Sequence, residues 1–140
     1  MKNILGTLAL FLATTIVLPF PSSSHAAEGE LSKKLIGRWE GGAATKHGGN
    51  EFLLIESVNC DGEQCTAAGR FGDAEKKGRD VSIKITTAGD DVILDFTTPS
   101  QNQNPVHVKL VGDGALEGSM RVPGPRSTII NAETRFKRID

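Results

Sequence analysis

The sequence predicts an all-β fold, a single eight-stranded antiparallel up-and-down barrel preceded by a short helical turn. From residue 36 onward, apolar and polar residues alternate with a period of two, turn-forming residues separate the alternating runs, and no helical period appears. An open sheet of such strands would leave its apolar face and both edges uncovered, so the sheet must close or fold over. A β-sandwich is the alternative fold.

The chain begins with a segment organised like a secretory signal peptide. A lysine near the start precedes an uncharged apolar run over residues 4–18, and Ser24 and Ala26 fit the −3 and −1 positions of a cleavage site. The run is shorter than the roughly 20 residues of a membrane-spanning helix. We therefore expect a signal peptide over residues 1–26, a barrel domain over residues 27–140, and no membrane span after cleavage.

The elements of the barrel domain are expected in a simple order. Glu28–Lys34 forms the helical turn, which places Leu31 and Leu35 on one face. Strands follow, separated by turns such as Gly89-Asp90 and Asp113-Gly114, which reach positive φ at little cost. The eight strands are expected at Ile36–Gly42, Glu51–Asn59, Cys65–Gly72, Arg79–Thr87, Asp91–Thr97, Val106–Gly112, Ala115–Val122 and Thr128–Ile139.

The two cysteines of the chain are placed to form a disulfide. Cys60 and Cys65 bracket the turn-rich tetrapeptide Asp61-Gly62-Glu63-Gln64. A cross-strand pair on facing strands has Cα atoms about 4.5 Å apart, which a disulfide accepts. A metal pair or a redox pair is the alternative, but the spacing is not C-x-x-C, and we expect no metal site. A disulfide and a signal peptide together predict a periplasmic or secreted protein.

The alternation assigns one apolar face of each strand to the interior. Residues Trp39, Leu54, Phe71, Leu94, Phe96, Met120 and Phe136 are predicted to line a ligand cavity, with Ile83, Val108 and Ile130 as further interior residues. Large rings are scarce and several strand positions hold Gly or Ala, so the interior is expected to leave space; the alternative is a filled core. The mouth of the cavity is expected between the loops Ala43–Asn50 and Pro99–Asn104.

The two ends of the predicted barrel resemble those of a known superfamily. Leu35-Ile36-Gly37-Arg38-Trp39-Glu40-Gly41 joins a helical turn to G-x-W, and Thr134-Arg135-Phe136-Lys137-Arg138 ends the last strand. This arrangement resembles the calycin barrels, which include lipocalins, fatty-acid-binding proteins and avidins. The resemblance implies that Trp39 lies near the closed end under a basic residue of the last strand, Arg135 or Arg138; we take Arg135 as the closure residue.

The resemblance stops short of the ligands of particular calycins. The chain is too short for the C-terminal helix of a lipocalin, and it has one Trp and no Tyr, unlike biotin pockets. Bacterial barrel inhibitors of secreted metalloproteases share the small, exported profile. By analogy with them, Ala27–Leu31 would be an arm that enters a protease.

Few residues suggest catalysis. His47 and His107 are isolated, and the sequence contains no nucleophile elbow, zinc-protease motif or phosphate-binding glycine loop. A net charge of −1 argues against binding to nucleic acid. The sequence thus predicts an exported, non-enzymatic barrel that binds a small, mainly apolar ligand without a cofactor. The alternative is a module that binds another exported protein.

Overall fold

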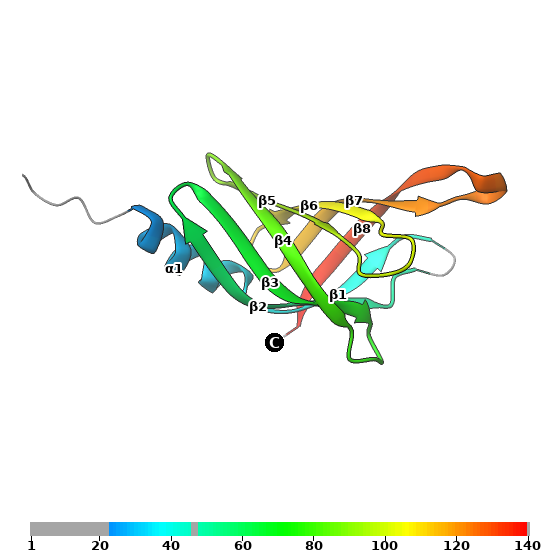
Figure 1. The fold of residues 1–140 in the computed structure, drawn as a ribbon, viewed down its shortest axis with the longest axis horizontal. Helices are drawn as coiled ribbons and strands as arrows, with labels where there is room; N and C mark the ends of the chain where they lie inside the picture. Colours follow the sequence, from blue (N-terminus) through cyan, green and yellow to red (C-terminus); the bar gives the residue numbers. More distant parts are fainter. Residues whose placement is uncertain (1–22, 46–47, 140) are drawn as a thin grey trace, which may run out of the picture.

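A computed structural model describes residues 23–45 and 48–139, which form a helix followed by a closed antiparallel barrel (Figure 1). Each strand pairs with the next, and β1 also pairs with β8. The elements are α1 (Ser23–Leu35), β1 (Gly37–Ala43), β2 (Glu51–Asp61), β3 (Gln64–Asp73), β4 (Arg79–Ala88), β5 (Asp91–Thr97), β6 (Pro105–Val111), β7 (Ala115–Pro123), the 3₁₀ turn η1 (Pro125–Ser127) and β8 (Ile129–Ile139). The predicted up-and-down barrel is confirmed.

The helix differs most from the prediction. The sequence suggests one turn, whereas α1 has 13 residues and begins at Ser23, before the predicted cleavage position. An isolated helix of this length is marginal in water, so its packing against the barrel stabilises it. Leu31 and Leu35 supply that packing, with exposed fractions of 5% and 0%. Residues 1–22 of the predicted signal peptide lie outside the described residues.

The disulfide between Cys60 and Cys65 is present and closes the β2–β3 hairpin. The two residues face each other directly across the strands, with Cα atoms 4.1 Å apart, and the turn between the strands is Gly62-Glu63. Helix α1 contacts the same hairpin, because a carboxylate oxygen of Glu28 accepts a hydrogen bond from the backbone N–H of Cys60 at 3.0 Å. The disulfide therefore fixes the register of a hairpin that also holds the helix.

The closed end of the barrel is filled by side chains. Nine inward-facing side chains there and in the middle have an exposed fraction of 0%, so no water-sized void borders them; they are Leu35, Trp39, Leu53, Ile55, Ile83, Leu94, Val108, Leu116 and Phe136. Interiors of proteins are packed to this density wherever no ligand is accommodated. The filled core was the alternative to a deep cavity, and this half of the barrel has it.

Two residues predicted to face the interior lie elsewhere. In β2 it is Leu53, opposite Trp39, that points inward, whereas Leu54 stands half-buried on the outer face, opposite Arg38. Four apolar residues in a row hid the alternation there, and the pairing with Trp39 decides it. Ile130 lies beyond the rim of the barrel and is 42% exposed.

The closure residue is Arg138 and not Arg135. Arg138 is the cross-strand partner of Trp39, and its guanidinium lies 5.2 Å from the centroid of the indole ring. Arg135 faces outward, where it pairs with Glu117 at 3.3 Å. The parity of β8 explains the correction, because Arg138 shares a face with buried Phe136 while Arg135 occupies the opposite face.

Arg138 also holds the end of α1. Its guanidinium donates to the carbonyl oxygens of Lys34 at 2.9 Å and Ile36 at 2.6 Å. The indole N–H of Trp39 donates to the carbonyl of Leu35 at 3.0 Å. These carbonyl groups lie at the C-terminal end of α1, where carbonyls lack hydrogen-bond partners within the helix. The negative end of the helix dipole also favours a cation at this position. One cross-strand pair thus seals the barrel and caps the helix.

We predict that Arg138→Ala lowers the free energy of unfolding by about 2–3 kcal/mol. The substitution removes a cation–π contact and charged hydrogen bonds to two helix-end carbonyls. Arg135→Ala is the matched control, with an expected loss within about 0.5 kcal/mol, because its side chain is 70% exposed. Urea unfolding of both variants measures the difference, and equal losses would contradict the assignment of Arg138.

Candidate functional site

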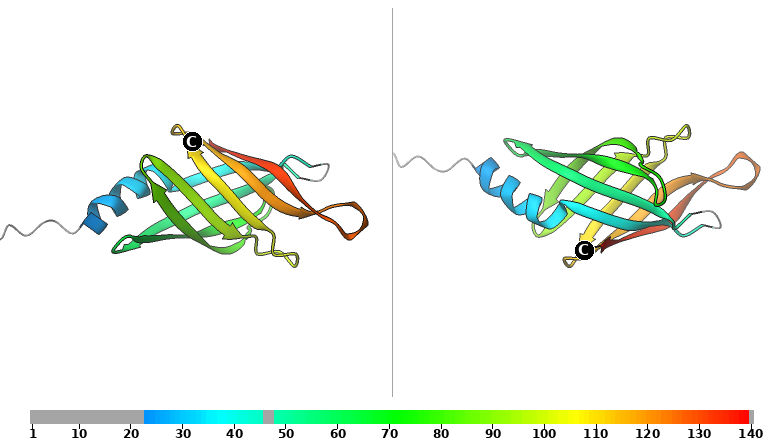
Figure 2. Two further views of the ribbon diagram at one scale, coloured as in Figure 1. Left: turned by 90° about the horizontal axis from the view of Figure 1, so that it is seen from above. Right: turned by 90° about the horizontal axis from the view of Figure 1, so that it is seen from below.

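The end of the barrel opposite α1 is open and carries a pocket of about 750 Å³, here called the mouth pocket. Figure 2 shows α1 at one end of the molecule, and the β7–β8 hairpin extending from the other. The pocket is formed by the start of β2, the β3–β4 turn and the β5–β6 loop. Its lining residues are Asn50, Glu51, Phe71, Gly72, Asp73, Lys76, Lys77, Gly78, Arg79, Pro99, Ser100 and Gln101.

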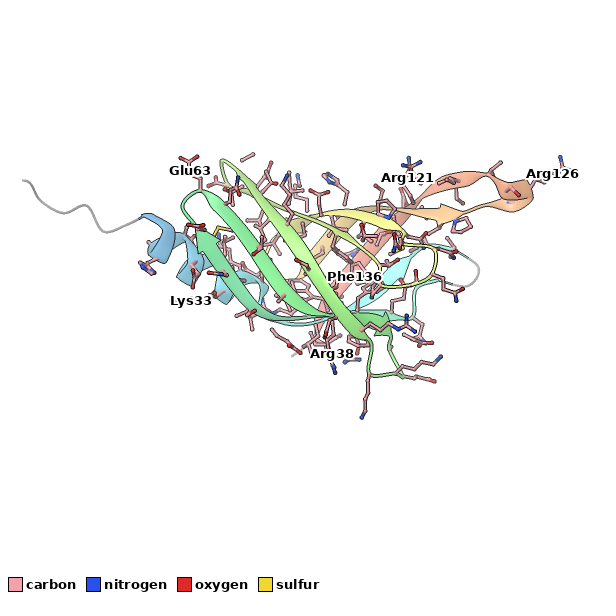
Figure 3. The ribbon with its side chains drawn as sticks, viewed as in Figure 1. Lys33, Arg38, Glu63, Arg121, Arg126 and Phe136 are labelled. Carbon is pink, nitrogen blue, oxygen red and sulfur yellow. A yellow bond between two sulfur atoms is a disulfide. The ribbon has the colours of Figure 1, made fainter. Side chains whose placement is uncertain are left out.

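An aromatic cluster separates the mouth pocket from the filled core. Phe71 faces inward at the open end of β3, with its ring centroid 5.6 Å from Phe96 and 6.3 Å from Phe136. Both contacts are tilted or edge-on, the geometries that aromatic rings prefer. In Figure 3, Phe136 is seen near the middle of the barrel. The mouth pocket therefore has an apolar floor at Phe71 and does not continue as a deep cavity.

Contacts on the outer face hold the β3–β4 turn in place beside the pocket. Phe52 is buried on the outer face, with the guanidinium of Arg38 lying 4.3 Å from its ring centroid and Gly78 packed against the ring. Arg38 also donates to the carbonyl of Ala74 at 3.2 Å. The turn is therefore fixed from outside, and it carries Lys76 and Lys77 to the rim.

A buried threonine organises the β5–β6 loop on the other side of the pocket. The hydroxyl of Thr98 accepts a hydrogen bond from the backbone N–H of Asn104 at 2.9 Å and lies 3.0 Å from the hydroxyl of Ser100. The backbone N–H of Thr98 donates to the carbonyl of Asn104. These bonds close the loop on itself, so Pro99 and Gln101 are presented to the pocket by an ordered segment.

The barrel wall is split beside the mouth pocket. Strand β4 pairs with β5 only from Lys84 to Ala88. Its first part, Arg79–Ile83, pairs with β3 but not with β5 among the described residues. A shallow groove of about 820 Å³ lies on the outer surface along this split, and we call it the side opening. Phe96, Val81 and Ile83 lie at its base and are nearly fully buried. The guanidinium of Arg79 spans the split, donating to the carbonyl of Pro99 at 3.3 Å. Arg79, Pro99, Ser100 and Gln101 line both the mouth pocket and the side opening.

The rim of the mouth pocket carries three cationic side chains, Lys76, Lys77 and Arg79. Glu51, the cross-strand partner of Asp73, also lines the pocket; it is half-buried, and its Oε2 atom has no hydrogen-bond partner among the described residues. Burial raises the pKa of Glu51 above its usual value; the nearby charge of Asp73 raises the pKa further, while the backbone N–H of Ala43 lowers it. The pocket thus combines an aromatic floor with three cationic side chains and two carboxyl groups, Glu51 and Asp73, of which Glu51 has a raised pKa.

Of the seven predicted ligand-contacting residues, two border an opening. Phe71 lines the mouth pocket and Phe96 lines the side opening. The Pro99–Gln101 part of the predicted mouth loop lines both. Four belong to the packed core: Trp39, Leu94, Met120 and Phe136. The rim residues were missed, because a Lys-Lys-Gly-Arg turn is also the sequence of an ordinary solvated turn.

Of the two candidate catalytic histidines, only His107 is among the described residues, and it does not border this site. His47 lies outside the described residues. His107 is on the outer face of β6, where its Nδ1 pairs with Asp95 of β5 and Ser119 of β7 stands opposite. This row has the order carboxylate, imidazole, hydroxyl, but neither opening described above borders His107 or Ser119. Strands pair with β6 on both sides, which engages backbone N–H groups that an oxyanion would need.

Comparison with protein families, curated protein sequences and solved structures finds no match for this chain. The barrel is compatible with a lipocalin-like fold, and that likeness rests on the strand topology and on Trp39 and Arg138 at the closed end. None of the helices within residues 23–45 and 48–139 is long and apolar enough to cross a membrane.

We predict that Glu51→Gln is more stable than the parent at pH 7, and that the advantage disappears below pH 4. The folded protein holds the Glu51 proton more tightly than the unfolded chain does, so ionisation of Glu51 costs no stability at low pH. The cost grows as the pH rises from the ordinary carboxyl pKa to the raised pKa of the folded state, and is constant above it. Denaturant unfolding between pH 3 and pH 8 measures this. Glu63→Gln, exposed on the β2–β3 turn, is the control; an advantage that is the same at every pH would refute the assignment.

Proposed function

We propose that this chain is an exported, non-enzymatic barrel that binds a small amphipathic molecule at its open end. The carrying observation is the mouth pocket itself, an aromatic floor at Phe71 beneath a basic rim. Its volume of about 750 Å³ lies within the range of about 300–1,000 Å³ usual for small-molecule sites.

The lining indicates which part of the ligand goes where. Phe71, which is 5% exposed, offers a small apolar contact for a hydrocarbon or aromatic group, and the nearly buried Phe96 and Val81 lie at the base of the neighbouring side opening. Lys76, Lys77 and Arg79 favour an anionic head group such as a carboxylate, sulfonate or phosphate. An amphipathic anion would therefore lie with its apolar end inward and its charge at the rim.

This proposal moves the ligand from the deep interior to the mouth. The predicted deep site would require displacement of side chains such as Trp39 and Phe136, which have no exposed surface. Opening an apolar cavity at such a position costs several kcal/mol. The shallower pocket needs no such displacement, and the surrounding loops are already held by their own hydrogen bonds.

The alternative function, protein inhibition through an N-terminal arm, has less support. Ala27–Leu31 belongs to α1, with Leu31 buried and Glu28 bonded to the β2–β3 hairpin. Entering a protease cleft would require this segment to leave the barrel. A disulfide-closed hairpin agrees with a periplasmic or secreted location, which completes the proposal.

Anilinonaphthalene sulfonate, an aromatic anion that fluoresces in apolar surroundings, tests the proposed site. We expect saturable binding of one probe per chain, because the probe has both groups that the mouth pocket accommodates. The double variant Lys76→Glu/Lys77→Glu should weaken binding about tenfold, since each reversed charge contributes up to about 1 kcal/mol at an exposed site.

One control variant and a second pocket variant complete this experiment. Lys137→Glu changes the same charge on the outer face of β8, away from the pocket, and should leave the dissociation constant unchanged. Phe71→Leu should weaken binding while keeping an apolar floor, and its folding is checked by the unfolding transition. Probe binding that is unaffected by both the Lys76→Glu/Lys77→Glu variant and Phe71→Leu would reject the mouth pocket as the site.

A further inference from the structure

The β7–β8 hairpin extends beyond the rest of the barrel rim. Strand β8 pairs with β1 as far as Thr134, and β7 pairs with β6 as far as Met120, yet β7 and β8 continue to pair with each other up to Pro123 and Ile129. Figures 1 and 2 show this hairpin projecting at the end opposite α1. The turn η1 at its tip is stabilised by the hydroxyl of Thr128, which donates to the carbonyl of Pro125.

The projecting part of this hairpin, residues 121–131, displays apolar side chains to solvent. Ile129 is 64% exposed and its neighbour Ile130 is 42% exposed, and Ile129 is the most exposed of the large apolar side chains among the described residues. Adjacent residues of a strand point to opposite faces, so both faces of the tip are apolar. Exposed Pro123 lies across from Ile129 and adds to the same surface.

Cationic side chains flank these isoleucines, and acidic ones are absent from the segment. Arg121 and Arg126 are exposed, and Figure 3 shows both at the projecting end of the molecule. From residue 120 to residue 132 the sequence contains no Asp or Glu. An apolar tip within a basic frame matches the interface of a bilayer that carries anionic lipids, where apolar side chains enter the headgroup region and arginines meet phosphates.

The turns at the opposite end of the molecule are acidic. The three turns beside α1, at residues 60–65, 88–91 and 111–115, carry five acidic residues and no basic one. Figure 3 shows Glu63 at this end. Near an anionic surface such a charge distribution turns the hairpin toward the surface and the closed end away from it.

We propose that residues 121–131 form a docking arm for anionic lipid surfaces, with Ile129 and Ile130 entering the interface and Arg121 and Arg126 contacting lipid phosphates. The attachment is reversible, because a few apolar side chains and two arginines give modest affinity. Docking of this kind places the open end of the barrel toward the bilayer. The proposal does not depend on what the mouth pocket binds.

Tryptophan reporters at the two ends of the barrel test the docking arm. Ile129→Trp places a reporter on the arm, and Val111→Trp places one at the β6–β7 turn, where the native side chain is 41% exposed. Both variants are titrated with vesicles whose acyl chains carry bromine, made of phosphatidylglycerol and phosphatidylcholine or of phosphatidylcholine alone. Trp39 has no exposed surface and gives the same background in both variants.

We expect the anionic vesicles to quench at least about half of the added emission of the Ile129→Trp variant, and little of that of the Val111→Trp variant. Neutral vesicles or 0.5 M salt should remove most of the quenching. Adding Arg121→Glu/Arg126→Glu to the Ile129→Trp chain should weaken vesicle binding about tenfold. Lys33→Glu/Lys137→Glu, the same charge change on other exposed lysines, should have little effect.

Three outcomes would overturn the proposal. Equal quenching of the two reporters would mean that the arm has no special contact with lipid. Equal quenching of the Ile129→Trp emission by neutral and by anionic vesicles would show that the arginines do not contribute to binding. A protein-concentration-dependent blue shift of the Ile129→Trp chain, without vesicles and with no quenching in their presence, would instead assign the arm to contact with a second copy of this chain.

Discussion

Pairing of the first strand with the last is the constraint on which the rest of the structure depends, because each strand has one apolar face and the sheet has no second layer to cover it. The β1–β8 ladder turns that face inward and removes both edges. Trp39 and Arg138 are opposite each other in this ladder, so the contact that seals the closed end belongs to the closure itself. The helix is then held by the same two side chains.

Strand pairing is less complete at the open end of the barrel, and the features that suggest function lie at that end. Strand β4 does not pair with β5 on the N-terminal side of Lys84, which leaves the side opening next to the mouth pocket. Strands β7 and β8 outrun their neighbours and form the docking arm. The packed core lies directly beneath the mouth pocket, because the ring cluster around Phe71 forms the base of that pocket. Stability and binding are therefore divided between the two ends of one barrel.

The period-two alternation predicted the strands, because a strand that is half buried must alternate. The short turns between them and the uncovered apolar face predicted the closed barrel, and the cysteine spacing about a turn predicted the disulfide. The alternation failed where the local pattern was ambiguous. The run Phe52-Leu53-Leu54-Ile55 reads equally well in either register, and only the pairing with Trp39 places Leu53 inside. The parity of β8 relative to Phe136 would have selected Arg138 over Arg135.

The pocket could not be predicted in the same way. Its rim comes from turns that are distant in the sequence, and charged turn residues look alike whether or not they border a pocket. Nor does the sequence tell how far a hairpin extends past its neighbours, since that depends on where the adjacent strands stop pairing. The filled interior also resists prediction, because scarce aromatic rings were compensated by close packing of Leu, Ile and Val around Trp39 and Phe136.

Native-state amide hydrogen exchange tests most directly whether the barrel is closed by β1 and β8 and loosened at its open end. We predict that amides in the β1–β8 ladder, from Arg38 to Gly42 and from Phe136 to Arg138, exchange only on global unfolding. Amides that point into the side opening between Arg79 and Ile83, and those on the free edge of the docking arm, should exchange much faster. Early exchange in the β1–β8 ladder, with protection along the side opening, would contradict this prediction.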